Sequence, residues 1–314
     1  MESIIRDGVT IYIPQEICGL IIHHWPTNLT KRELINLCLV SNGFCAEARH
    51  LLYSAVFLTG KDIYFSFCNT VIRRPILVEG MQQLVLVLPL QKTYSIGDYM
   101  IKQVLNFATH LCDLRILCDP KRSSRNVRRV GRSILEGHKF KLTTFVNTYF
   151  EMPEIVKFLA SQPTIETFVT DQLDTQSLME LPLTSLRNLR CAFDPADLTF
   201  LQALAGSSSS RWTVERLQLN ITSKAPASLR GILESLGQHL GQKLRSLSLV
   251  LVIQIYEIPI VQRIVRNVAV HLPRVKFLEL VCEKNESTGL IIDINNTATP
   301  PNTSLHTLLL HPPT

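Results

Sequence analysis

The residues that could do chemistry directly are few and do not form a known catalytic or metal-binding motif. His23 and His24 are adjacent, so their side chains would diverge on a helix and would not share a metal ion. Cys112 and Cys118 lie on or near one expected strand, but a structural zinc site needs four ligands. The chain lacks the GxSxG, HExxH, phosphate-binding-loop and GxGxxG patterns. We therefore expect no enzyme, metal or cofactor.

A basic segment, residues 121–132, is the one dense cluster of charge. Its spacing would place Arg125, Arg128, Arg129 and Arg132 on one face of a helix. Such a face suits a phosphorylated or acidic protein, a nuclear-import receptor or a nucleic acid, or it is simply a solvated surface. We favour the solvated surface and expect no nucleic-acid partner, because no aromatic residues are interleaved with the arginines and the net charge is only +6.

The elements that would position these residues follow a repeat. The spelling apolar-x-x-apolar-x-apolar recurs from residue 81 onward, and each copy predicts a short strand. The third and fourth copies depart from the spelling, with Asn147 and Thr170 in the last apolar position. The copies are MQQLVL (81–86), LCDLRI (111–116), LTTFVN (142–147), IETFVT (165–170), LRNLRC (186–191), VERLQL (214–219), LRSLSL (244–249), VKFLEL (275–280) and LHTLLL (305–310).

Amphipathic helices are expected between these strands, at 99–110, 152–161, 196–205, 228–240 and 259–272. Gly241 follows one of them and is expected to adopt a left-handed cap. A strand and a helix every ~20–30 residues is typical of leucine-rich repeats, whose units stack because one unit cannot bury its own apolar face. We predict an α/β fold in which about nine such repeats span residues 59–314, with a parallel concave sheet and a convex helical side.

The residues that flank the central leucine of each strand would face the concave side and are the candidate substrate-binding residues. Many of them are apolar, so either loops or the terminal strand cover them, or they form a protein-binding surface. They are Val85, Val87, Arg115, Leu117, Val146, Val169, Arg190, Arg216, Gln218, Ser248, Val250, Glu279, Val281, Leu309 and His311.

Residues 11–58 lack the repeat and predict three helices. Pro14 is expected to open the first helix at its N1 position. Thr30 and Glu33 have the spacing of a capping box at the start of the second helix. The third helix is expected to run from about Asn42 through Leu52.

This N-terminal segment resembles an F-box, the three-helix module that docks on the Skp adaptor of cullin–RING (SCF) ubiquitin ligases. Together with the repeats, it makes the chain similar to F-box/leucine-rich-repeat proteins, notably the divergent fungal sets. The resemblance is carried by Ile13, Pro14, Glu16, Ile17, Leu20 and Ile21 in the opening motif, Glu33, Leu34, Ile35, Leu37, Val40, Ser41 and Phe44 in the centre, and Arg49, Leu51, Leu52 and Tyr53 at the close.

The resemblance implies a substrate-recognition subunit of an SCF-type ligase. Residues 1–58 would bind a Skp-type adaptor, and through it a cullin scaffold, while the repeats would hold a protein substrate. The alternatives are a repeat scaffold whose N-terminal helices only cap the first repeat, and a small hydrolase with a polar pocket. The candidate adaptor-binding residues, which could equally pack the module's own core, are Ile13, Pro14, Ile17, Leu20, Ile21, Leu34, Leu37 and Val40.

The sequence also bears on location. It has no run of about 20 apolar residues and no apolar leader near Glu2 and Asp7, so we expect neither a membrane span nor a secretory signal. The eight cysteines show no CxxC pair and are expected to be reduced. We therefore expect the protein in the cytoplasm, the nucleus or both.

Overall fold

The computed structural model describes residues 2–6, 9–24, 29–88, 95–118, 132–171, 183–193, 214–221, 226–251, 258–282, 288–293 and 309–311. The chain forms two compact units, Met1–Leu142 and Thr143–Thr314. Both units are mixed α/β, and together they contain nine strands that pair in parallel, three in the first unit and six in the second. The boundary predicted after residue 58 remains a prediction.

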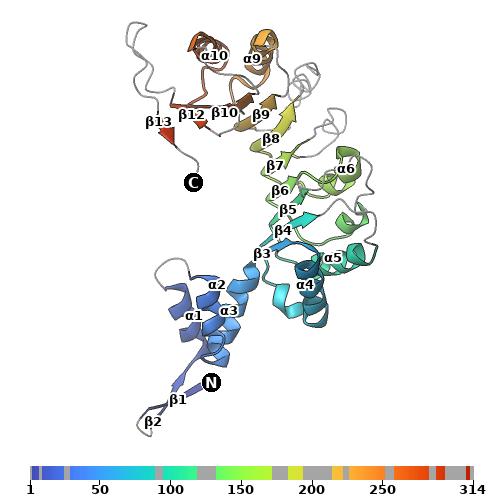
Figure 1. The fold of residues 1–314 in the computed structure, drawn as a ribbon, viewed down its shortest axis with the longest axis vertical. Helices are drawn as coiled ribbons and strands as arrows, with labels where there is room; N and C mark the ends of the chain where they lie inside the picture. Colours follow the sequence, from blue (N-terminus) through green and yellow to red (C-terminus); the bar gives the residue numbers. More distant parts are fainter. Residues whose placement is uncertain are drawn as a thin grey trace. The chain divides into compact units, whose positions relative to one another are not determined.

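The first unit opens with an antiparallel hairpin and three helices, which we call the helical module (Figure 1). As predicted, Thr30 and Glu33 form a capping box, in which Thr30 N–H donates to Glu33 Oε2 at 2.7 Å and Glu33 N–H donates to Thr30 Oγ1 at 3.3 Å. Pro14 does not lie inside the first helix but precedes it in an extended conformation. The elements are β1 (Glu2–Arg6), β2 (Val9–Ile13), α1 (Gln15–His23), α2 (Lys31–Leu37) and α3 (Asn42–Ser54).

Helix α3 runs directly into the first parallel strand, β3, which the repeat pattern did not predict. Val56 and Leu58 of β3 are buried, and the alternation of its side chains matches that of the next strand. Gly60 then adopts a φ of 78°, which only glycine tolerates easily, and helix α4 begins. The remaining elements of this unit are β3 (Ala55–Thr59), α4 (Lys61–Arg73), η1 (Pro75–Val78), β4 (Gln83–Leu88), α5 (Ser95–Phe107), β5 (Asp113–Cys118) and η3 (Arg132–Leu135).

A half-buried histidine ties the end of this unit to helix α5. One ring nitrogen of His138 donates to the carbonyl of Ile134, the other lies 2.9 Å from the side-chain oxygen of Asn106, and the ring stacks on Phe140. Burial lowers the pKa of His138, and the charge of Lys102 lowers it further, while the Ile134 hydrogen bond opposes both.

The second unit continues the strand pattern. Six parallel strands pair in sequence order, and Phe145 of the first stacks on Phe168 of the next with ring centroids 6.0 Å apart. The elements are β6 (Thr144–Asn147), α6 (Met152–Ala160), β7 (Thr167–Thr170), β8 (Asn188–Phe193), β9 (Arg216–Ile221), α9 (Pro226–Leu240), β10 (Ser246–Leu251), α10 (Ile258–His271), β11 (Phe277–Cys282), β12 (Thr288–Asp293) and β13 (Leu309–His311).

Eight of the nine hexamers therefore carry a parallel strand, as predicted. The central residues of these strands are packing residues, each at most 2% exposed. These residues are Leu84, Leu114, Phe145, Phe168, Leu189, Leu217, Leu247 and Leu278.

The ninth hexamer was predicted wrongly. Its last residues form β13, which pairs antiparallel with β12, and β12 itself pairs antiparallel with β11. The direction of a strand depends on the connection before it, which the hexamer does not encode. The helix predicted at 196–205 lies outside the described residues.

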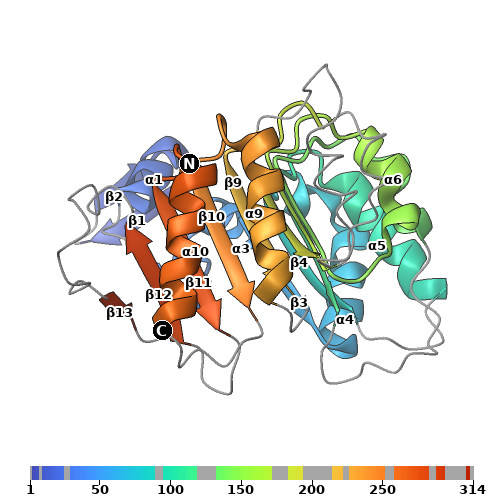
Figure 2. The ribbon, with the colours of Figure 1, turned by 90° about the horizontal axis from the view of Figure 1, so that it is seen from above.

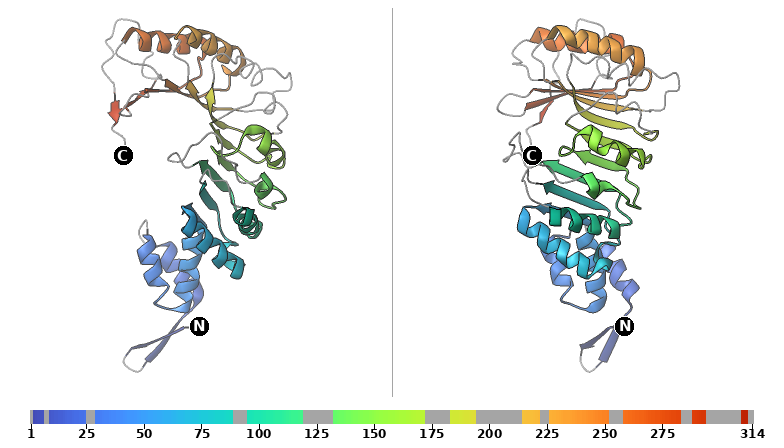
Figure 3. Two further views of the ribbon diagram at one scale, coloured as in Figure 1. Left: turned by 45° about the vertical axis from the view of Figure 1, so that its right-hand side comes forward. Right: turned by 90° about the vertical axis from the view of Figure 1, so that its right-hand side faces the viewer.

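Helices α9 and α10 cover one face of β9, β10 and β11 (Figures 2 and 3). Two glycines let them approach closely, because a Cβ on Gly237 would lie 2.4 Å from the His271 carbonyl oxygen, and one on Gly241 would lie 3.1 Å from the same oxygen. The prediction of a left-handed cap at Gly241 is wrong, since the positive-φ glycines of the described chain are Gly60 and Gly137. Close packing is what requires glycine at position 241.

Candidate functional site

Helix α1 carries apolar side chains on both of its faces. Cys18 and Ile22 are buried toward the core of the helical module, where Ile22 packs with Leu34 and Ala48. On the opposite face, Ile17 is 42%, Leu20 53% and Ile21 37% exposed. Apolar side chains on two opposite faces of a helix normally have packing partners on both faces. The second face of α1 therefore has the character of a contact surface.

A second set of exposed apolar residues lies in the turn between α2 and α3. Leu39 is 82% exposed and Val40 is 62% exposed. The turn ends beside the first turn of α1, because a Cβ on Gly43 would lie 3.1 Å from Cys18 Sγ and 3.9 Å from the Gln15 Cα. The exposed residues of α1 and of this turn thus come from neighbouring parts of the module.

The predicted adaptor-binding residues divide by burial. Leu34 is 7% exposed and belongs to the core of the module, and the partly buried Leu37 packs against that core. Ile13 ends strand β2 and is half-buried. The other predicted residues, Pro14, Ile17, Leu20, Ile21 and Val40, are exposed.

Two further residues qualify as surface candidates and were not predicted as such. Leu39 and Ile35, the latter 54% exposed, stand on the same elements as Val40 and Leu34. The apolar run from Leu37 to Val40 was the available signal for Leu39, because a helix that ends there cannot bury every member of the run.

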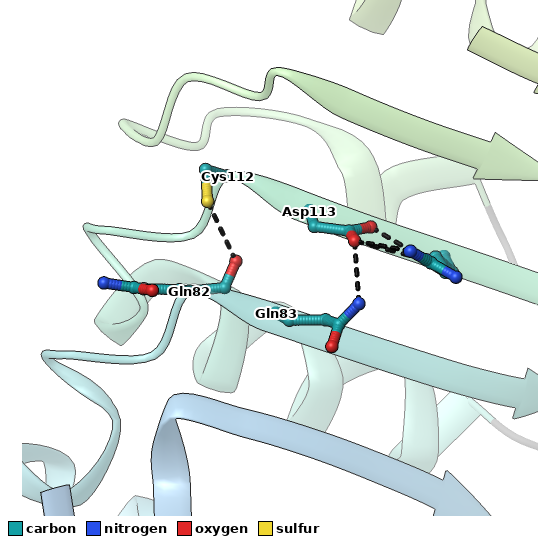
Figure 4. Close-up of polar contacts among 5 residues, drawn as sticks. Gln82, Gln83, Cys112 and Asp113 are labelled. Atoms are coloured by element: carbon teal, nitrogen blue, oxygen red, sulfur yellow. Dashed lines mark hydrogen bonds and ion pairs between the residues drawn. The ribbon is translucent and has the colours of Figure 1, made fainter. Parts of the chain in front are cut away.

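The sheet face of the first unit opposite helices α4 and α5 carries an ordered polar cluster (Figure 4). Gln83 Nε2 donates to Asp113 Oδ2 at 2.7 Å, and Arg115 donates to the same carboxylate from Nε at 3.0 Å and from Nη2 at 2.8 Å. The hydrogen bond to Asp113 raises the pKa of Arg115. The charges of Arg115 and Asp113 cancel, so the cluster as a whole has no net charge. Its hydrogen bonds hold the Arg115 side chain in place.

Apolar side chains surround this cluster. In the strand register Phe57 lies opposite Val85, and Val85 lies opposite Arg115, while Val87 lies opposite Leu117. Phe57 is 55% exposed, Val85 only 9%, and the other predicted residues of this face are half-buried. Phe57 is thus the largest exposed side chain of the face, and the repeat pattern, which starts after it, did not include it.

The sheet face of the second unit brings most of the remaining candidates into one row. The row begins with the half-buried Val146 and Val169, continues with the exposed Arg190, and ends with three further polar residues. Ser248 is only 9% exposed, and its hydroxyl donates to Glu279 Oε2 at 2.6 Å. The row is Val146, Val169, Arg190, Gln218, Ser248 and Glu279.

Five predicted residues stand outside this row. Arg216 is exposed on the same face, two residues before Gln218, and Val250 is half-buried two residues after Ser248. Val281 and Leu309 lie in strands β11 and β13, and their side chains, like that of His311, lie outside the described residues.

The groups first considered for chemistry are not brought together. Among the described residues there is no group of three or more histidine, cysteine, aspartate or glutamate side chains that could hold a metal ion. Burial raises the pKa of the Cys68 and Cys191 thiols to about 12, so both stay protonated at neutral pH. Arg125, Arg128 and Arg129 of the basic segment lie outside the described residues, as does the side chain of Arg132.

Comparison with known proteins adds no family or relative. The sequence matches no protein-family model, and a search of the curated proteins finds no match. In the part of the chain that the structure describes, no helix has the length and apolar character needed to span a bilayer.

Proposed function

We propose that this protein is the substrate-recognition subunit of an SCF-type ubiquitin ligase. In this proposal residues 1–58 act as an F-box that binds a Skp-type adaptor, and through it a cullin, while the repeats act as a leucine-rich-repeat array that holds a protein substrate. The observation that carries the proposal is the second apolar face of α1, formed by Ile17, Leu20 and Ile21, with Leu39 and Val40 nearby.

The physical basis is the burial of this face against another helical surface. An apolar helix face commonly docks into a groove lined by apolar residues, and burying one leucine or isoleucine side chain contributes about 1.5–3 kcal/mol. Three or four such side chains supply an interaction of the strength that a stable adaptor complex needs. Pro14 would add contact area at little entropic cost.

The chain itself would then do no chemistry. Holding a substrate and the ligase machinery in one complex raises the effective concentration of the substrate near the charged conjugating enzyme. The polar cluster of the first unit and the arginines of the second would serve recognition of the substrate rather than catalysis.

The alternative is a repeat scaffold outside any ligase, with the helical module as a cap on the first strand. The direct passage of α3 into β3 favours a capping role, because it joins the module to the edge of the sheet. A cap, however, needs only one apolar face on α1, whereas the structure has two.

The two functions are separated by measuring adaptor binding. Purified chain is titrated into a Skp-type adaptor, and the Ile17→Asp/Leu20→Asp double variant is compared with Ile63→Asp. Ile63 lies in α4 and is 57% exposed, close to the 53% of Leu20, so it controls for adding a charge to an exposed apolar site.

We expect wild type and Ile63→Asp to bind alike, and the double variant to bind at least roughly a hundredfold more weakly, since two buried side chains are lost. Pro14→Ala/Ile17→Ala should show a smaller loss. Failure of the wild-type chain to bind the adaptor would refute the ligase proposal and favour the scaffold.

A further inference from the structure

Four polar residues on the sheet face of the second unit opposite helices α9 and α10 form a compact pattern, which we call the arginine tile. Strand β8 contributes Asn188 and Arg190, and strand β9 contributes Arg216 and Gln218. The register pairs Asn188 with Arg216 and Arg190 with Gln218. The two arginines therefore occupy one diagonal of the tile and the two amides occupy the other. Backbone positions diagonal to each other on neighbouring strands are about 7–8 Å apart.

Both arginines are exposed. Among the described residues neither of them forms an ion pair, and Arg115 with Asp113 is the one pair found there. Burial raises the pKa of Asp171, at the end of β7, and the charge of Arg190 partly offsets that shift. Two like charges therefore lie diagonal to each other on one face, with the Asp171 carboxylate near Arg190, whereas Arg115 of the first unit is paired directly with Asp113. Such an arrangement favours an anionic partner.

The amides and their neighbours supply additional donors. Asn188 Nδ2 donates to Thr167 Oγ1 at 2.9 Å, and Gln218 Nε2 lies 3.5 Å from Asn220 Oδ1. A side-chain amide has two N–H groups, so each keeps one for a ligand. Strand β10 places Ser246 opposite Arg216, which adds a hydroxyl at the border of the tile.

We infer that the arginine tile binds an oxyanion group, a carboxylate or a phosphate, carried by the protein substrate. This inference rests on the proposed function for the identity of the bound protein, but the anion site stands on the tile alone. Guanidinium groups bind carboxylate and phosphate oxygens through paired, charge-assisted hydrogen bonds, and the amide N–H groups are placed to complete the contacts. The half-buried Val146 and Val169 beside the tile would contact an apolar part of the same segment.

The test uses inorganic phosphate and acetate as separate probes of the whole 314-residue chain, so that the two sources of the oxyanion are distinguished. The readout is the shift of the arginine Nε–H resonances in the wild-type chain, and of the backbone amide resonances of β8 and β9 in the wild-type chain and in every variant, at constant ionic strength. The variants are Arg190→Gln/Arg216→Gln and, as a matched control, Arg245→Gln. Arg245 is likewise exposed but precedes β10, outside the tile.

We expect one of the two anions to produce saturable shifts at Arg190 and Arg216, with binding roughly tenfold or more weaker in the double variant and unchanged in Arg245→Gln. Shifts that do not saturate, or that Arg245→Gln reduces equally, would overturn the inference. Adaptor binding by the double variant should equal that of wild type. Loss of the anion site and loss of adaptor binding are therefore separate outcomes, and neither failure can be mistaken for the other.

Discussion

Replacing Asn147 by leucine separates what the repeat pattern predicts from what the structure predicts. Position 147 is the last apolar position of its hexamer, so the pattern alone favours Asn147→Leu. In the structure Asn147 is completely buried, and its side chain holds the turn after β6. Its Nδ2 donates to the Phe150 carbonyl at 2.7 Å, and its Oδ1 accepts from the N–H groups of Phe150 at 2.8 Å and Tyr149 at 3.3 Å.

The substitution removes three hydrogen bonds to buried backbone groups. Leaving such a group without its partner costs about 1–3 kcal/mol, whereas a buried leucine side chain contributes about 1.5–3 kcal/mol. We therefore expect Asn147→Leu to destabilise the second unit by about 2–5 kcal/mol. That corresponds to a fall in melting temperature of roughly 5–15 °C for a unit of this size.

Thermal unfolding and hydrogen exchange both test this expectation. Exchange at the Phe150 amide should become at least roughly tenfold faster, since 1.4 kcal/mol corresponds to a factor of ten. Thr170→Val is the matched control, because Thr170 occupies the same register position on β7 and loses a single hydroxyl. An unchanged or raised melting temperature for Asn147→Leu would show that the apolar pattern, and not the hydrogen-bonded turn, determines stability here.

Two further predictions concern stability. Gly237→Ala should destabilise the second unit by about 1–3 kcal/mol in thermal unfolding, because its Cβ would meet the His271 carbonyl. Gly231→Ala is the control on the same helix: its Cβ would meet nothing within 4 Å, so it should be neutral or stabilising. A larger loss of stability in Gly231→Ala than in Gly237→Ala would disprove the packing argument. Because the pKa of His138 is lowered from 6.5 on folding, the unfolded chain binds this proton more readily. The free energy of unfolding of the first unit should therefore be highest above about pH 6.5 and fall as the pH drops below that value. His138→Gln should abolish this part of the pH dependence of the melting temperature.

Much of the strand framework was predictable because packing alone determines it. A residue such as Leu247 must be buried at the centre of its strand, and the spacing of such residues sets one strand per repeat. The capping box at Thr30 was predictable for a similar reason, because its hydrogen bonds join residues three apart in the chain.

The features that sequence reasoning missed depend on contacts between distant residues or on strand direction. Strand β12 reverses the chain against β11, and no property of residues 305–310 reveals this. Asn147 looked like a faulty repeat position because its hydrogen bonds form only when the turn is in place. In the helical module, Leu34 and Leu39 are chemically equivalent in the sequence, and only packing separates the buried residue from the exposed one.

The reversal at β12 also has a consequence for solubility. The backbone of β11 would otherwise offer six residues of unpaired donors and acceptors to a strand from another molecule. Strand β12 occupies that position, and β13 follows with only three residues. With β12 in place, the backbone of β11 is no longer a template for pairing between molecules, so the chain reversal protects a leucine-rich sheet from polymerising along β11.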